Sequence, residues 1–176
     1  MGEASLVFGE TEDLKPKITH DVFINHRGVD TKRNIAGLLY DRFVQLDIKA
    51  FLDERSMGPG DKLHDSIESA IDKCRVGIVI LSPRYCESFF CLHELALMIE
   101  SGKKIIPIFY NIKPSELDIV EIEGNVPPEK LEGFSRALRQ VRCTVGITFD
   151  SQNGNWSELI SRTVDAVQNS LNNETY

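Results

Sequence analysis

Residues 76–82 read VGIVILS, an apolar run that continues without a break from Ile78 to Leu81. A run of this kind is typical of a strand buried on both faces of a parallel sheet, because a half-exposed strand alternates apolar with polar residues. Further short runs rich in β-branched or aromatic residues predict strands at 20–25, 48–53, 104–110 and 145–150. Helical patterns occur at about 31–46, 65–74, 89–99, 127–142 and 155–171.

The alternation of strands and helices predicts an α/β fold, a parallel sheet with helices on both faces. Pro107 favours a place near the edge of the sheet for the strand 104–110, because proline donates no ladder hydrogen bond. Ligands of such open sheets bind beyond the carboxyl ends of the strands. The loops 25–31, 53–61 and 82–89 are therefore the predicted surroundings of a functional site.

The composition is that of one globular domain, with 176 residues, 41% apolar and 27% charged. We expect a flexible leader at 1–17, the domain at 18–172 and a polar tail at 173–176. No apolar run approaches the ~20 residues that a membrane helix needs, and the N-terminus lacks the pattern of a secretory signal. The net charge of −7 argues against a broad nucleic-acid surface.

Several classes of site are disfavoured by spacing. Neither GxGxxG nor GxxxxGK[ST] occurs, which argues against a standard dinucleotide or P-loop site. The four cysteines form no CxxC pair and are typical of reduced thiols in a cytoplasmic protein. A metal site from Cys86, Cys91 and His93 is disfavoured, because residues 91 and 93 point to different faces of a helix, so we expect no metal. The histidines interpreted as structural or solvent-exposed are His20, His64 and His93.

Glu94 stands out within the helical stretch 89–99, FFCLHELALMI. The residues one turn away on either side are apolar, namely Phe90, Cys91, Leu97 and Met98. An apolar setting without a cation raises a carboxyl pKa or holds the group for a ligand. The alternative is an ordinary glutamate that reaches water at the edge of the core.

The loop NHRGVDTKRN, 25–34, carries a second set of candidates. Arg27 supplies a fixed positive charge, Gly28 permits close backbone approach, and Asp30 or Thr31 can cap the next helix. His26 lies beside Arg27 and keeps functional weight. The alternative is an ordinary turn with an exposed arginine. Asp53 ends a strand as a receiver-domain aspartate does, but the first strand lacks the additional acids that receivers use for a divalent ion.

Five ordered stretches resemble a plant-type Toll/interleukin receptor (TIR) domain. The similarity covers roughly residues 19–171, and the matching stretches are NHRGVDTK (25–32), LLYDRFVQLDIKAFLDE (38–54), MGPGDKL (57–63), LSPRYCESFFCLHEL (81–95) and PIFYNIKPSEL (107–117).

The resemblance implies a flavodoxin-like, five-stranded parallel sheet in the order 2-1-3-4-5. It also implies an NAD⁺ hydrolase or cyclase that becomes active when TIR domains associate and that signals in plant immunity and cell death. Glu94 takes the catalytic position of the family motif Cys-Leu-x-Glu-Leu. The implied substrate-binding residues are Asn25, His26, Arg27, Gly28, Val29, Asp30, Lys32, Asp53, Cys86 and Phe90. The implied self-association residues are Met57, Gly58, Pro59 and Gly60.

The resemblance implies no cofactor, with NAD⁺ or NADP⁺ as substrate and other TIR domains as partners, in the cytoplasm or the nucleus. In NAD⁺ the nicotinamide leaves as a neutral group, so an anion beside the oxocarbenium-like ribose supplies the main stabilisation. We assign that role to Glu94. Arg27 and the amides near Gly28 would hold the adenosine or phosphate side, and Phe90 would form an aromatic wall.

The chain departs from the family pattern at several positions. Asn25-His26 replaces Ser-Phe, Phe90 replaces Trp, and Gly37-Leu38 stands where many plant members have Ser-His for self-association. Lys32 replaces Arg, and Cys86 replaces Ala. Two alternatives stay open: a non-catalytic adaptor that only assembles with other TIR domains, and a nuclease or cyclic-nucleotide synthetase. The presence of Glu94 favours the enzyme over the adaptor.

Overall fold

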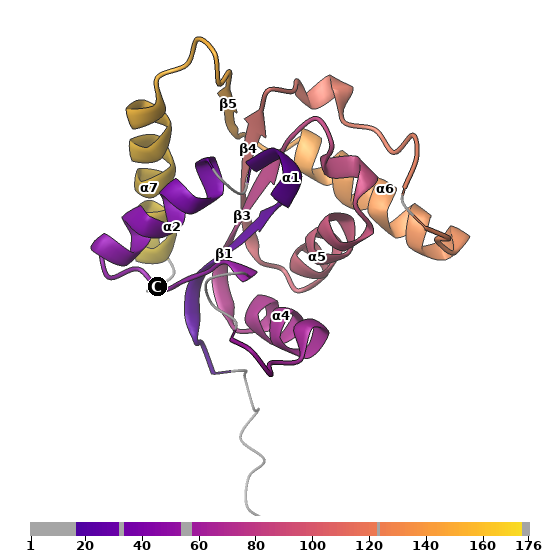
Figure 1. Ribbon diagram of the computed structural model, residues 1–176, viewed down its shortest axis with the longest axis horizontal. Helices are drawn as coiled ribbons and strands as arrows, with labels where there is room; N and C mark the ends of the chain where they lie inside the picture. Colours follow the sequence, from indigo (N-terminus) through magenta and orange to yellow (C-terminus); the bar gives the residue numbers. More distant parts are fainter. Residues whose placement is uncertain (1–16, 32–33, 54–57, 123, 174–176) are drawn as a thin grey trace, which may run out of the picture.

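The computed structural model describes residues 17–31, 34–53, 58–122 and 124–173. Its centre is a five-stranded parallel sheet in the order β2-β1-β3-β4-β5 (Figure 1). The strands are β1 His20–His26, β2 Ala50–Phe51, β3 Cys74–Leu81, β4 Lys104–Tyr110 and β5 Ile147–Phe149. The predicted fold class and strand order are confirmed.

Helices cover both faces of the sheet (Figure 1). One layer contains α2 Ile35–Gln45 and α7 Trp156–Asn173, and the opposite layer contains α4 Leu63–Asp72, α5 Phe89–Glu100 and α6 Pro128–Arg142. Short turns α1 Gly28–Thr31, η1 Tyr85–Glu87 and η2 Pro114–Glu116 lie in the connections. Within the described residues, no helix combines the length and the apolar character needed to cross a membrane.

The central strand β3 is buried at every residue except Arg75. Val76, Ile78 and Ile80 pack with the α2–α7 layer, whereas Val79 and Leu81 pack with the α4–α6 layer. All five are 0% exposed, as the unbroken apolar run predicts.

Gly77 lets α5 lie close to the sheet. A Cβ atom at this position would stand 2.6 Å from the Met98 sulfur on α5, which is closer than van der Waals contact allows. Because Gly77 has no side chain, the helix that carries Glu94 can pack closely against β3.

One of two local expectations is corrected. The helix predicted from 31 to 46 starts later, because Asn34, and neither Asp30 nor Thr31, caps α2 by accepting a hydrogen bond from the Ile35 amide at 2.6 Å. The strand with Pro107 lies near the edge of the sheet, as expected, since only β5 lies beyond β4. Pairing with β5 begins at Ile108, so the missing proline donor falls where β5 has not yet started.

Candidate active site

Glu94 lies in the second turn of α5, behind the carboxyl end of β1. The helix starts at Phe89, where the Ser88 hydroxyl accepts a hydrogen bond from the Cys91 amide at 3.3 Å. This start directs the second turn of α5 toward Asn25, the penultimate residue of β1. The Asn25 side-chain Nδ2 donates to Glu94 Oε2 at 2.9 Å.

The carboxyl group of Glu94 is partly buried and has a neutral donor as its partner. Burial raises its pKa to about 8, the negative charge of Asp53 also raises it, and the Asn25 hydrogen bond lowers it. The expected rise in pKa is confirmed. The helix pattern did not show that Glu94 has a hydrogen-bond partner, because Asn25 lies on a strand 69 residues earlier.

A pocket of about 180 Å³ lies in front of Glu94, between α4 and α5. It brings together Glu94, Asp53 and Phe90, three of the predicted site residues. The apolar part of its wall comes from Leu63, Ile67 and Leu97. Because apolar walls lower the local dielectric constant, a charge inside this pocket interacts more strongly than it would in water.

His93 also lines the pocket, a position that the sequence did not predict for it. Its Nε2 lies 3.5 Å from Glu68 Oε1 on α4, which links the two helices at the pocket rim. The imidazole stacks on Phe89, with ring centroids 5.6 Å apart and an interplanar angle of 12°. His93 and Glu94 are neighbours in the sequence, and both side chains line this pocket.

The end of β1 is joined to its surroundings by side chains. Asn25 is 1% exposed and fully engaged within the protein, so its predicted contact with substrate is corrected to a contact with Glu94. His26 Nδ1 lies 2.9 Å from Thr31 Oγ1, and its Nε2 lies 3.9 Å from Asp53 Oδ1. His26 thus lies beside one of the pocket residues.

Polar groups of the 25–31 loop form hydrogen bonds that fix the conformation of the loop. The Asp30 carboxylate accepts hydrogen bonds from Ser82 Oγ at 2.6 Å and from the Arg84 amide at 2.9 Å, which joins this loop to the one after β3. The Arg27 carbonyl accepts from the Thr31 amide and hydroxyl. Val29 is 66% exposed. Gly28 has open space around it, and the roles of Arg27, Gly28 and Val29 in binding stay predictions.

The structure leaves other predicted residues away from the pocket. Cys86 lies near Asp118 and Arg142, and burial, with the Asp118 charge, raises its pKa to about 11. Lys32 and Met57 lie outside the described residues. Gly58, Pro59 and Gly60 precede α4, and the Gly58 amide donates to Asp61 Oδ2 at 2.8 Å. Their role in association stays a prediction. Among the described residues, no group of three potential metal ligands occurs.

Tyr85 is a part of the site that sequence reasoning missed. Its hydroxyl donates to Asn25 Oδ1 and lies 3.1 Å from the Cys91 carbonyl oxygen. A buried tyrosine needs a hydrogen-bond partner, but the sequence does not show which one.

The family of this chain follows from a match to a known domain family. The model of the TIR domain matches residues 19–175. The chain belongs to the TIR domain family. This TIR chain is 53% identical over 151 residues to the "Probable 2' cyclic ADP-D-ribose synthase BdTIR" of Brachypodium distachyon, covering 84% of this chain and 67% of that protein.

Other relatives include the "Disease resistance protein RPV1" of Vitis rotundifolia, which is 28% identical over 92% of this chain and 10% of that protein. Among solved structures, the TIR domains of the activated Roq1 resistosome match with a TM-score of 0.73 and 25% identity. That match covers 85% of this chain and 99% of the Roq1 chain. The motif-based assignment to TIR domains is confirmed.

Proposed function

We propose that this TIR domain cleaves the nicotinamide–ribose bond of NAD⁺, as an NAD⁺ hydrolase or cyclase, with Glu94 as the catalytic group. The observation that carries the proposal is the Glu94 carboxyl in a partly apolar pocket, with its pKa raised to about 8. The name of the Brachypodium relative, a 2' cyclic ADP-D-ribose synthase, supports this class of chemistry.

The reaction breaks the bond between the ribose C1′ and the nicotinamide nitrogen, and the electron pair leaves with the nicotinamide. Positive charge then spreads over C1′ and the ring oxygen, where ionised Glu94 stabilises it by Coulombic attraction. Attack by water gives ADP-ribose, and attack by a hydroxyl of the same molecule gives a cyclic product. In both cases the attacking oxygen loses one proton.

The raised pKa of Glu94 fits a cationic substrate. In the free protein the carboxyl is largely protonated near pH 7, since its pKa is about 8. The positive nicotinamide–ribosyl group favours the ionised form, because an opposite charge lowers a carboxyl pKa. Substrate binding thus generates the catalytic anion. Phe90, which is 55% exposed at the pocket, offers an aromatic face beside it.

Self-association, immune signalling and cell death are part of the same proposal. The resistosome structure with TIR domains and the disease-resistance relative support this setting. The predicted association segment 57–60 lies just before Leu63, which lines the pocket, so contacts made there would act on the α4 wall. We propose that the protein acts in the cytoplasm or nucleus and uses NAD⁺ or NADP⁺ without a cofactor or metal.

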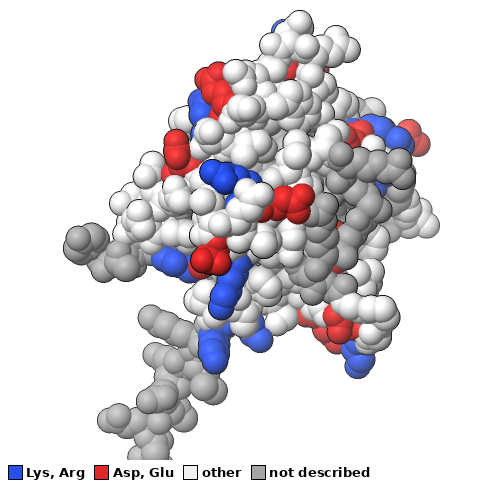
Figure 2. All heavy atoms as spheres, turned by 60° about the vertical axis from the view of Figure 1, so that its left-hand side comes forward, with Lys and Arg blue, Asp and Glu red and all other residues white. Residues whose placement is uncertain are grey.

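Duplex nucleic acid is a less suitable partner. Figure 2 shows the α2–α7 side of the molecule, where the described lysine and arginine side chains lie among acidic ones and do not form one continuous basic surface. The net charge of −7 also argues against such binding, since phosphate binding needs clustered cations.

The adaptor alternative does not explain why a carboxyl group is buried in a pocket.

The test is release of nicotinamide from NAD⁺ at high protein concentration. We expect release by the wild-type protein and none above background by Glu94→Gln, which keeps the shape but loses the charge. Glu100→Gln is the matched control, because it makes the same change at the exposed end of the same helix. Equal release by wild-type protein and Glu94→Gln would refute the proposal, and absence of release from both, even when association is forced, would favour the adaptor.

A further inference from the structure

The Glu94 carboxyl is connected to the core through Asn25 and Tyr85. Asn25 lies opposite Val79 in the β1–β3 ladder. Both the oxygen and the nitrogen of its side-chain amide form hydrogen bonds. Oδ1 accepts from the Tyr85 hydroxyl, whereas Nδ2 donates to Glu94 Oε2 at 2.9 Å and lies 3.3 Å from the Cys91 carbonyl oxygen.

Tyr85 determines which way the Asn25 amide points. Tyr85 is 0% exposed, and burial raises the pKa of its hydroxyl well above the ordinary value, so the group stays neutral and keeps its proton to donate. The acceptor on Asn25 is the amide oxygen. Rotating the amide by half a turn would place its NH₂ group against the hydroxyl and its oxygen against the carboxyl oxygen of Glu94.

Tyr85 is itself held in place by the start of η1. Its backbone amide donates to the Ser82 carbonyl at 3.0 Å, and its hydroxyl reaches the Cys91 carbonyl on α5. The phenol therefore spans from the loop after β3 to the helix that carries Glu94.

We propose that Tyr85 and Asn25 form a positioning pair, in which Tyr85 orients the amide and Asn25 holds the Glu94 carboxyl in its reactive orientation and favours its ionised form. The inference rests on the proposed function, because the reactive orientation has meaning only if Glu94 meets the ribose. Both residues act through Glu94 and are buried away from the pocket, so neither touches the substrate.

A donor hydrogen bond stabilises a carboxylate more than a carboxylic acid, so removal of Asn25 should raise the pKa of Glu94. The ionisable groups around Glu94 are Asp53 after β2, His26 on β1, Glu68 on α4, Tyr85 in η1, and Cys91 and His93 on α5, with Arg27 near Cys91. Asn25→Ala leaves all of these groups in place, and Tyr85→Phe removes only the Tyr85 hydroxyl, which burial keeps neutral.

The experiment measures the titration of Glu94 by NMR, with the protein carrying ¹³C at glutamate side-chain carboxyls and Glu94→Gln identifying the signal. We expect Asn25→Ala to raise the pKa of Glu94 by about one unit, and Tyr85→Phe to raise it by a smaller amount. Thr163→Val is the matched control, since it also removes a fully buried hydroxyl, on α7 across the sheet.

Nicotinamide release gives a second readout. A rise of about one unit lowers the ionised fraction of Glu94 in the free protein at pH 7 by about tenfold, so kcat/KM should fall to a similar extent. The rising limb of the pH–rate profile should move to higher pH in Asn25→Ala and in Tyr85→Phe. The Thr163→Val profile should match that of the wild-type protein.

The two proposals fail in different ways. If Glu94→Gln keeps its activity, the catalytic role is refuted, while the NMR titration still tests the positioning pair. If Asn25→Ala and Tyr85→Phe leave the pKa of Glu94 as it is in Thr163→Val, the positioning pair is refuted. Should Asn25→Ala fail to fold, Tyr85→Phe alone decides the question by the same criterion.

Discussion

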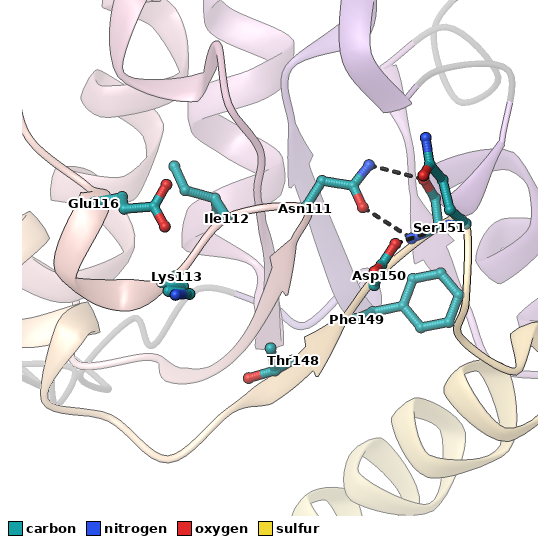
Figure 3. A pocket seen from close by; sticks show the side chains of 9 residues that line it. Asn111, Ile112, Lys113, Glu116, Thr148, Phe149, Asp150 and Ser151 are labelled. Carbon is teal, nitrogen blue, oxygen red and sulfur yellow. Dashed lines mark hydrogen bonds between the residues drawn. The ribbon is translucent and has the colours of Figure 1, made fainter.

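Two hollows of this molecule differ in size and in chemistry. The larger, about 520 Å³, lies at the carboxyl ends of β4 and β5 (Figure 3), and the smaller, about 180 Å³, holds Glu94. In the larger one, Asn111 Nδ2 donates to Ser151 Oγ at 2.9 Å and Asn111 Oδ1 accepts from the Ser151 amide at 2.8 Å, as the dashed lines in Figure 3 show. These bonds connect two loops.

The acids of the two hollows lie in opposite environments. The Gln152 amide and the Asn153 side chain donate to Asp150, and these bonds hold the pKa of its exposed carboxyl below the ordinary value. Burial raises the pKa of Glu94 to about 8. The comparison favours the smaller hollow as the place of the reactive group, because desolvation, and not volume, changes the chemistry of a carboxyl.

Neutralising each acid in turn tests which of the two hollows holds the reactive group. Glu94→Gln should lower nicotinamide release by about 10²–10³-fold or more, as the loss of one transition-state charge contact does. Asp150→Asn should leave release within about twofold, because the exposed carboxylate lies outside the pocket of Glu94. A large loss in Asp150→Asn would move the active site to the larger hollow. Rates of nicotinamide release at saturating NAD⁺ measure both.

The pH dependence of stability should have opposite signs at the two acids. The folded protein binds the Glu94 proton more tightly than the unfolded chain does, so this group lowers the free energy of unfolding as pH rises from about 4.5 to about 8. Glu94→Gln removes that loss and should be more stable than the wild-type protein by about 4–5 kcal/mol above pH 8. Urea unfolding at pH 5 and pH 9 measures the difference.

Asp150 gives the opposite sign in the same experiment. Its pKa is lowered in the folded protein, so its contribution to stability is present above the unfolded pKa and disappears as pH falls through the folded value. Asp150→Asn should therefore be slightly less stable at neutral pH and equal to the wild-type protein in acid. The same sign for both variants would contradict the contrast between the two environments.

The Asn111–Ser151 connection should affect stability and not activity. Asn111→Ala removes both hydrogen bonds and places alanine at a φ of 54°, so we expect a loss of about 1–2 kcal/mol in the free energy of unfolding. Asn111→Gly is the control, since glycine removes the bonds but tolerates the positive φ and should lose less. Nicotinamide release should be unchanged in both, and a change would indicate coupling between the two hollows.

The smallest expected effect concerns the aromatic wall of the Glu94 pocket. Phe90 is 55% exposed, and Phe90→Trp enlarges the aromatic face without altering the core. Better stacking should lower KM for NAD⁺ by about two- to threefold, while Phe90→Ala should raise it. Steady-state kinetics at constant protein concentration measure KM. An unchanged KM in both variants would show that the ring does not contact the substrate.

Much of the fold follows from local patterns. The apolar run at 76–82 predicts a central strand, and β3 is central and buried. The pattern around Glu94 predicts a carboxyl with a raised pKa, as found. The break between α1 and α2 was missed, because helix periodicity does not show that Asn34 caps a new start. The place of His93 at the pocket could not be predicted, because the direction of its side chain depends on contacts with Phe89 and Glu68.

The sequence by itself determined the strand and helix order, the TIR family and the choice of Glu94, because hydrophobic periodicity and ordered motifs are local properties of the chain. The tertiary structure alone decided that Asn25 is the partner of Glu94, that Tyr85 orients Asn25, and that Asp53 faces the same pocket. These contacts join residues tens of positions apart. Their geometry depends on strand register and on how closely α5 packs over Gly77, and neither can be read from neighbours in the chain.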